Sequence, residues 1–152
     1  MRIEITIPAM EWTTLRKVPK KKEYKKHTKL HIGAYVGNVF RTRSAVQKRH
    51  RAWKDHARLY IDAKLRSEGW NGSPIDSKGV KLTTQAYFEN KVHFDSLNVQ
   101  KGMEDVLVWR EGQSSKGTFF LKEDKYMSGA YMAPKYDKVN PRLVVILEGV
   151  NL

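Results

Sequence analysis

The stretch from Ser44 to about Ser67 constrains the fold most, because its apolar residues recur at the spacing of an α-helix until Gly69 ends the pattern. The recurring apolar positions are Val46, Trp53, Ala57, Tyr60, Ile61 and Leu65. Basic side chains cover much of the remaining helix surface, at Lys48, Arg49, Arg51, Lys54 and Arg58. A helix with one apolar stripe has to bury that stripe against a second layer of structure. The sequence therefore predicts one long helix that packs on another element.

Strand-like segments elsewhere in the chain can supply that second layer. Residues 2–7 alternate like a strand, and residues 80–88 and 143–147 are rich in β-branched or aromatic side chains. Shorter extended segments are expected at residues 30–40, 118–121 and 126–136, and a second amphipathic helix at 95–108. With 152 residues, no internal repeat and no long linker, the chain is expected to form one α+β domain over 1–152. In that domain a small mixed β-sheet packs with two main helices.

The charge balance favours a polyanionic partner. The chain carries 29 Lys and Arg against 16 Asp and Glu, a formal net charge of +13. Nucleic acid is the first candidate, because each neutralised phosphate releases counterions. The absence of cysteine excludes disulfides, thiolate zinc sites and a cysteine nucleophile. No apolar run approaches the roughly 20 residues of a membrane span. Because nothing in the sequence directs the chain elsewhere, we expect a cytoplasmic protein, and with DNA as the partner a nucleoid-associated one.

Residues 16–29 concentrate this positive charge. Blocks of like charge repel one another and seldom pack, so a mobile basic loop or arm is expected here. The candidate nucleic-acid contacts are Arg16, Lys17, Lys20, Lys21, Lys22, Lys25, Lys26 and Lys29. Trp12 and Tyr24 lie beside or within this segment, and aromatic rings near basic residues can stack on unpaired bases. Such an arm can also act without any sequence preference.

The second predicted helix has a polar face of ordered composition. Asn98, Lys101 and Asp105 fall on one side of it, and the apolar residues Val99, Met103, Val106 and Leu107 collect on the other. Asp95 stands at its N-terminal entrance, where a carboxylate also serves as an ordinary helix cap. Lys101 with Asp105 is by itself a common solvated ion pair, worth about 0.3–0.5 kcal/mol. It is the joint spacing of acid, amide and lysine that favours a functional site.

This order of residues resembles the signature of the RusA-type Holliday-junction resolvases. That signature reads Asp-x-Asp-Asn-Leu-x-Lys-x-x-x-Asp-x-Leu, and an Asp-Asp pair follows it. In this chain the first Asp matches Asp95, the Asn matches Asn98 and the Lys matches Lys101. The helical Asp matches Asp105, and its companion Leu matches Leu107. The order of strand, basic loop, long helix and strand is similar over most of the chain, but only the motif region is specific.

The match continues with one substitution and one departure. The late acidic pair of the signature corresponds to Glu123-Asp124. The second Asp of the signature corresponds to Leu97, so one of the family's three carboxylates is missing. Three interpretations stay open: a neighbour such as Glu104, Glu123 or His93 replaces it, metal binding is weak, or the protein holds DNA without cutting it.

The resemblance implies a Mg²⁺-dependent endonuclease that resolves four-way DNA junctions as a homodimer in recombination and repair. The implied catalytic residues are Asp95, Lys101 and Asp124. The implied Mg²⁺ ligands are Asp95, Asp124 and Glu123, with Asn98 and Asp105 in supporting positions. Hard oxygen ligands of this kind are the ones that Mg²⁺ prefers.

The alternative is a basic nucleic-acid-binding protein without catalysis, either a degenerate resolvase or a ribosome-associated protein. Leu97 in place of an acid favours it. The two hypotheses differ in whether the carboxylates of Asp95 and Asp124 converge. Beyond about 8 Å, no single Mg²⁺ with ligand distances near 2.1 Å contacts both directly.

The remaining aromatic residues are assigned to packing. Trp53 and Tyr60 lie on the apolar stripe of the long helix, so we expect core or dimer contacts there. The segment Tyr126–Tyr136, with Met127, Tyr131 and Met132, suits the core better than a subunit interface. The histidines show no zinc spacing, and His93 alone is close to the proposed site.

Overall fold

The computed structural model describes residues 1–33, 44–91, 93, 96–108, 120–122 and 125–152, and the side chains of 44–47 are outside that description. Its centre is a mixed sheet. Strands β1 (Arg2–Pro8), β7 (Arg142–Glu148) and β4 (Lys81–Phe88) are adjacent and antiparallel. The short strands β5 (Ser128–Tyr131) and β6 (Lys135–Tyr136) both run parallel to β4 along its other edge.

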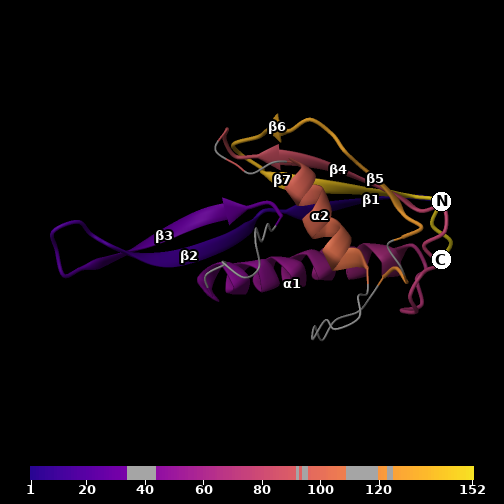
Figure 1. The fold of residues 1–152 in the computed structure, drawn as a ribbon, viewed down its shortest axis with the longest axis horizontal. Coiled ribbons are helices and arrows are strands. Elements are labelled where there is room, and N and C mark those ends of the chain that lie inside the picture. The colour runs from indigo at the N-terminus through magenta and orange to yellow at the C-terminus, as the bar shows by residue number, and fades with distance from the viewer. Residues whose placement is uncertain (34–43, 92, 94–95, 109–119, 123–124) are drawn as a thin grey trace.

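Helices α1 (Ser44–Ser67) and α2 (Ser96–Leu107) lie on the same side of this sheet, as Figure 1 shows. Every second side chain of a strand points toward the helices, because side chains alternate between the two faces of a sheet. In β1 the side chains of Ile3, Ile5 and Ile7 are buried, whereas Glu4 and Thr6 between them are exposed. The strands β7 and β4 continue this layer with buried Leu143, Val145, Leu147, Leu82 and Ala86. The predicted α+β architecture is thus confirmed.

The bounds of both helices agree closely with the sequence prediction. The stripe residues Trp53, Ala57, Ile61 and Leu65 are fully buried, because they face β1 and α2. The core alternative is wrong for Tyr60, which is 40% exposed at the rim of the stripe with its ring centroid 5.1 Å from that of His56, whereas the dimer contact stays a prediction. Val46 belongs to the part of α1 whose side chains are not described.

Arg58 is a second error, because it was expected on the solvated surface of α1. Its side chain is buried, and the carboxylate of Asp55 is 3.8 Å away. Burial lowers the pKa of the Arg58 guanidinium from its ordinary value. The helix period places residue 58 next to the buried Ala57, so a long side chain there lies along the core.

Residues 10–31 form a two-stranded antiparallel hairpin of β2 (Met10–Lys17) and β3 (Tyr24–His31). Figure 1 shows it extending well beyond the sheet and the helices. The expectation of a loop at 16–29 is therefore wrong for most of the segment: only 18–23 is a turn, and the rest is paired strand. Near the body the hairpin is anchored by buried Met10 and Ile32 and by half-buried Trp12.

The C-terminal third is extended, as expected, but its aromatic residues are not core. Tyr126, Tyr131, Met132 and Tyr136 are all exposed, and Met127 is the member of this segment that packs against the core. These residues lie in or beside β5 and β6, which are short strands at the edge of the sheet. Leu121 forms isolated parallel bridges with Ile75 and Val108 instead of the predicted strand 118–121, of which 118 and 119 lie outside the described residues. Most of the segment expected at 30–40 also lies outside them.

In the part of the chain that the structure describes, no helix has both the length and the apolar character needed to cross a membrane.

Candidate nucleic-acid interface

The hairpin concentrates positive charge on its surface. All of the predicted contacts are exposed on it: Arg16, Lys17, Lys20, Lys21, Lys22, Lys25, Lys26 and Lys29. The strand register places Arg16 directly opposite Lys25. Like charges in directly opposed positions destabilise a sheet. A polyanion bound along the hairpin would offset this repulsion. The charges of the hairpin are therefore more favourable when a phosphate backbone is bound than when the protein is alone.

The turn of the hairpin places three consecutive lysines at the tip. The Val18 amide donates to the carbonyl of Glu23 at 2.9 Å, which closes the turn. Lys20 within it has a φ of 62°, a left-handed conformation that a residue other than glycine adopts with some strain. Lower down, the hydroxyls of Thr13 and Thr28 are hydrogen-bonded across the strands at 2.7 Å. These contacts hold the lysines away from the body.

Helix α2, which carries the polar face, is attached to the sheet through a buried amide. The Thr84 hydroxyl and Gln100 Oε1 are 2.6 Å apart, and Gln100 Nε2 donates to the carbonyl of Leu82 at 3.3 Å. Gln100 is only 3% exposed. It was not among the predicted residues, although a polar side chain between Val99 and Met103 on an apolar face is a recognisable signal. Gln100 fixes the rotation of α2 and thereby the direction of its polar face.

That polar face has the arrangement predicted from helical spacing. Lys101 is exposed, and Asn98 and Asp105 are half-buried. The apolar residues Val99, Met103, Val106 and Leu107 are buried on the opposite side, as expected. Leu97, at the position of the missing family carboxylate, is 43% exposed, so packing of the core does not account for a leucine there.

The acids Asp95, Glu123 and Asp124 lie outside the described residues. Among the described residues, Ser96 borders Asp95, whereas Lys122 and Lys125 border Glu123 and Asp124. Ser96 begins α2, and Leu121 is bridged to Val108 just beyond the other end of that helix.

The corner between β4 and α2 is held by aromatic contacts. The rings of Phe88 and His93 are stacked, with centroids 3.8 Å apart and an angle of 8° between their planes. His93 Nε2 is also 2.9 Å from the Tyr136 hydroxyl, which ties the corner to β6. His93 therefore stabilises this corner through its contacts with Phe88 and Tyr136, and in the sequence it lies two residues before Asp95.

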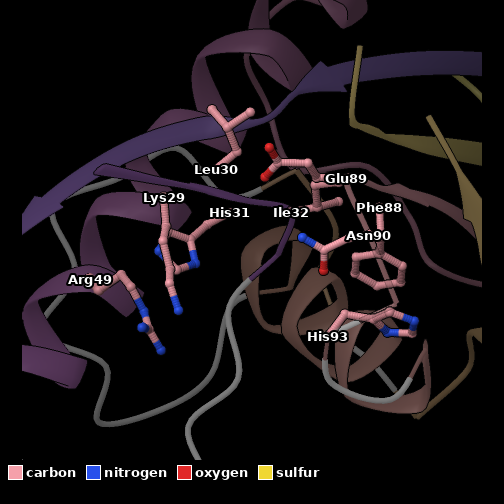
Figure 2. A pocket seen from close by; sticks show the side chains of 9 residues that line it. All are labelled: Lys29, Leu30, His31, Ile32, Arg49, Phe88, Glu89, Asn90 and His93. Atoms are coloured by element: carbon pink, nitrogen blue, oxygen red, sulfur yellow. The ribbon is translucent and has the colours of Figure 1, made fainter. Parts of the chain in front are cut away.

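A pocket of about 390 Å³ opens where the hairpin, α1 and this corner meet (Figure 2). Lys29 and His31 of β3 and Arg49 of α1 line one side, and Phe88 and Asn90 at the end of β4 line the other. This pocket was not predicted from the sequence, because its walls come from segments far apart along the chain. It joins the base of the basic hairpin to the end of β4 and to His93.

The electrostatics of the pocket favour an anion on the β3 side. The pKa of His31 is lowered to about 4, first by burial and then by the positive charges of Arg49 and Lys29. Neighbouring His50 is affected in the same way: its pKa is lowered to about 4 by burial and then by Lys54 and Arg49. At neutral pH both imidazoles are therefore uncharged, and Lys29 and Arg49 carry the positive charge of this side.

Within the described part of the chain, no group of three or more His, Cys, Asp or Glu side chains is placed to hold a metal ion. The acids that the resemblance implies as ligands are not in that part. Comparison of the chain with protein-family models, with curated proteins and with solved structures finds no match.

Proposed function

We propose that the protein is a Mg²⁺-dependent, structure-selective DNA endonuclease that resolves four-way junctions in recombination and repair. The observation that supports DNA binding is the hairpin, whose eight Lys and Arg side chains are all exposed and which places Arg16 directly opposite Lys25. A hairpin that stands away from the body can follow a phosphate backbone, and the pocket at its base extends from it to the end of β4. The catalytic part of the proposal rests on the resemblance of residues 95–107 and 123–124 to the resolvase signature.

In this proposal the polar face of α2 serves the scissile phosphate. Lys101 is exposed and available to stabilise charge that builds up on the phosphate. Asn98 orients a neighbouring carboxylate by hydrogen bonding, and Asp105, one turn from Lys101, restrains that lysine. Asp95, Glu123 and Asp124 have the hard oxygen donors that fit Mg²⁺. When bound there, the metal polarises a phosphoryl oxygen and lowers the pKa of an attacking water.

A second candidate is a junction-binding protein that does not cut. One observation favours it: Leu97 replaces an acid of the signature, and its exposure of 43% means that core packing does not account for a leucine there. Under this hypothesis the hairpin and the pocket keep their roles, and the acids serve as caps and turns.

A cleavage assay separates the two candidates. Labelled four-way junctions and matched linear duplexes are incubated with the protein, with and without Mg²⁺. Paired symmetric nicks on the junction alone, and only with the metal, are the result expected of the endonuclease. Tight junction binding without nicks would instead establish the binding protein.

The variant Asp124→Asn tests the assigned role of the late acid. We expect loss of cutting with junction affinity equal to or higher than that of the wild type, because a negative charge near phosphates is removed. Affinity is measured by gel shift without metal, with Asp76→Asn, an exposed acid on another loop, as the matched control. A parallel loss of binding and cutting would contradict the role given to Asp124.

A further inference from the structure

The pocket between β3, α1 and the β4–α2 corner has two chemically different sides. Lys29 and Arg49 make one side cationic. The other side combines buried Ile32 and the stacked Phe88–His93 pair with the amide of Asn90 (Figure 2). A site for a simple anion needs only the first side, and a site for an apolar ligand needs only the second. A ligand that satisfies both has a phosphate at one end and a flat ring with polar edges at the other.

We propose that this pocket holds one nucleoside monophosphate unit, with its phosphate at Lys29 and Arg49 and its base against Ile32 and the Phe88–His93 pair. The Asn90 amide, which projects into the pocket, then reads the polar edge of the base. Asparagine side chains pair with bases in this way because they offer a donor and an acceptor together.

The size and position of the pocket suit a nucleotide. Its volume of about 390 Å³ is at the small end of the range for ligand pockets, about 300–1,000 Å³, which fits one nucleotide and not a duplex. Bases that leave the stack are bound against aromatic or apolar side chains and recognised at their edges. Glu89 also lines the pocket, and in this proposal its carboxylate accepts a hydrogen bond from an exocyclic amino group of the base and repels a second phosphate.

The nucleotide can belong to a DNA strand or be free in solution. The position of the pocket favours the strand, since Lys29 belongs to the basic hairpin and His93 to the corner before α2. In that form the inference rests on the proposed function: an unpaired nucleotide beside the junction enters the pocket and orients the strand on α2.

The test compares two duplexes of the same sequence, one with a single-nucleotide bulge and one with an abasic bulge, in the absence of Mg²⁺ at fixed salt. We expect the wild-type protein to bind the bulged base about tenfold more tightly, the usual effect of stacking one base. In Asn90→Ala this preference is expected to shrink several-fold, whereas Asn140→Ala, an exposed asparagine outside the pocket, keeps it. Equal affinities of the wild-type protein for the two duplexes would overturn a strand nucleotide as the ligand.

Arginine variants test the phosphate end separately. Arg49→Gln is expected to weaken binding of both duplexes by the same factor, and by more than Arg51→Gln, an exposed arginine of α1 outside the pocket lining. Equal effects of the two substitutions would contradict a phosphate site at Arg49.

A titration with free deoxynucleoside 5′-monophosphates and with inorganic phosphate distinguishes the two sources. If the monophosphates bind more tightly than phosphate, if Asn90→Ala removes that difference, and if neither bulge is preferred, the ligand is a free nucleotide. If neither bulges nor monophosphates show dependence on the base, the inference is wrong. Junction cleavage is scored with Mg²⁺ in a separate assay, so the inference and the proposed function can fail independently.

Discussion

At the residue scale, the position of α2 depends on the contact between Gln100 and Gly129. A Cβ atom at Gly129 would lie 2.7 Å from Gln100 Nε2 and 2.9 Å from Glu104 Oε1. Gln100 has little freedom to move, because its amide is buried and bonded to Thr84 and Leu82. The absence of a side chain at 129 is therefore what allows β5 to lie against α2.

We predict that Gly129→Ala lowers the free energy of unfolding by about 1–3 kcal/mol, the usual cost of overpacking. Denaturant unfolding measures it, with Ser128→Ala on the same strand as the control. In a double-mutant cycle, Gln100→Ala should reduce the cost of Gly129→Ala, since it removes the nearer of the two atoms that a Cβ would meet. Strict additivity of the two substitutions would show that the strain arises elsewhere.

Helical spacing predicted most of the buried residues of α1. It failed for residues at the edge of the apolar stripe, where spacing alone does not decide whether a side chain is buried. Trp53 and Ile61 are buried as predicted, whereas Tyr60 is not buried in the stripe and Arg58 is not on the solvated surface. A residue at the rim of a stripe is buried or exposed according to what the neighbouring element places there. The same limit applied to Gln100, whose partners Thr84 and Leu82 are distant in sequence.

At the element scale, the hairpin shows why a basic segment was expected to be a loop. Its outer side chains are exposed on both faces, so the two-residue alternation that identifies a half-buried strand is absent. The strands exist because their backbones pair, and pairing in register leaves no signature in a run of lysines. The long helix, in contrast, has a buried face and was predicted with its bounds.

The tip of the hairpin is expected to contribute to binding through charge alone. We predict that neutralising Lys20, Lys21 and Lys22 together weakens binding to junctions and linear duplexes alike. It should also reduce the slope of log affinity against log salt, by up to about 0.9 for each phosphate that the tip no longer neutralises. Titrations at several salt concentrations measure this slope.

The control for this prediction neutralises three exposed lysines of the body, Lys78, Lys81 and Lys138. It removes the same net charge without touching the hairpin. If both triple variants reduce the slope equally, the net charge of the protein and not the hairpin sets the salt dependence. An unchanged slope in the hairpin variant would mean that its tip does not contact phosphates.

At the scale of the whole molecule, the layers of the fold were predicted from the sequence, but not which elements lie next to one another. One apolar stripe for each helix and alternating strands were enough to indicate a sheet with two helices against it. The pocket required the end of β3, α1 and the β4–α2 corner to be adjacent, which no local pattern encodes. The separation of Ser96 and Leu121 at opposite ends of α2 is likewise a product of topology.

The packing of β3 and α1 also makes the free energy of unfolding depend on pH, through His31 and His50. His31 and His50 have pKa values of about 4 in the folded protein against an ordinary 6.5, because burial and the cations Arg49, Lys29 and Lys54 disfavour their charged forms. Between these values the unfolded chain binds more protons than the folded one, so the free energy of unfolding falls as the pH drops from about 6.5 toward 4. Both rings are half-exposed, and solvent screening limits the effect to about 1 kcal/mol each between pH 7 and 5.

We predict that replacing both histidines, as His31→Gln and His50→Gln, flattens the dependence of unfolding free energy on pH in this range. Urea unfolding at pH 7, 6 and 5 measures it, with His27→Gln on the hairpin as the single-residue control. The comparison uses slopes and not absolute stabilities, since the double variant also changes packing around β3 and α1. A double variant that keeps the full wild-type slope would show that groups other than His31 and His50 link folding to protons.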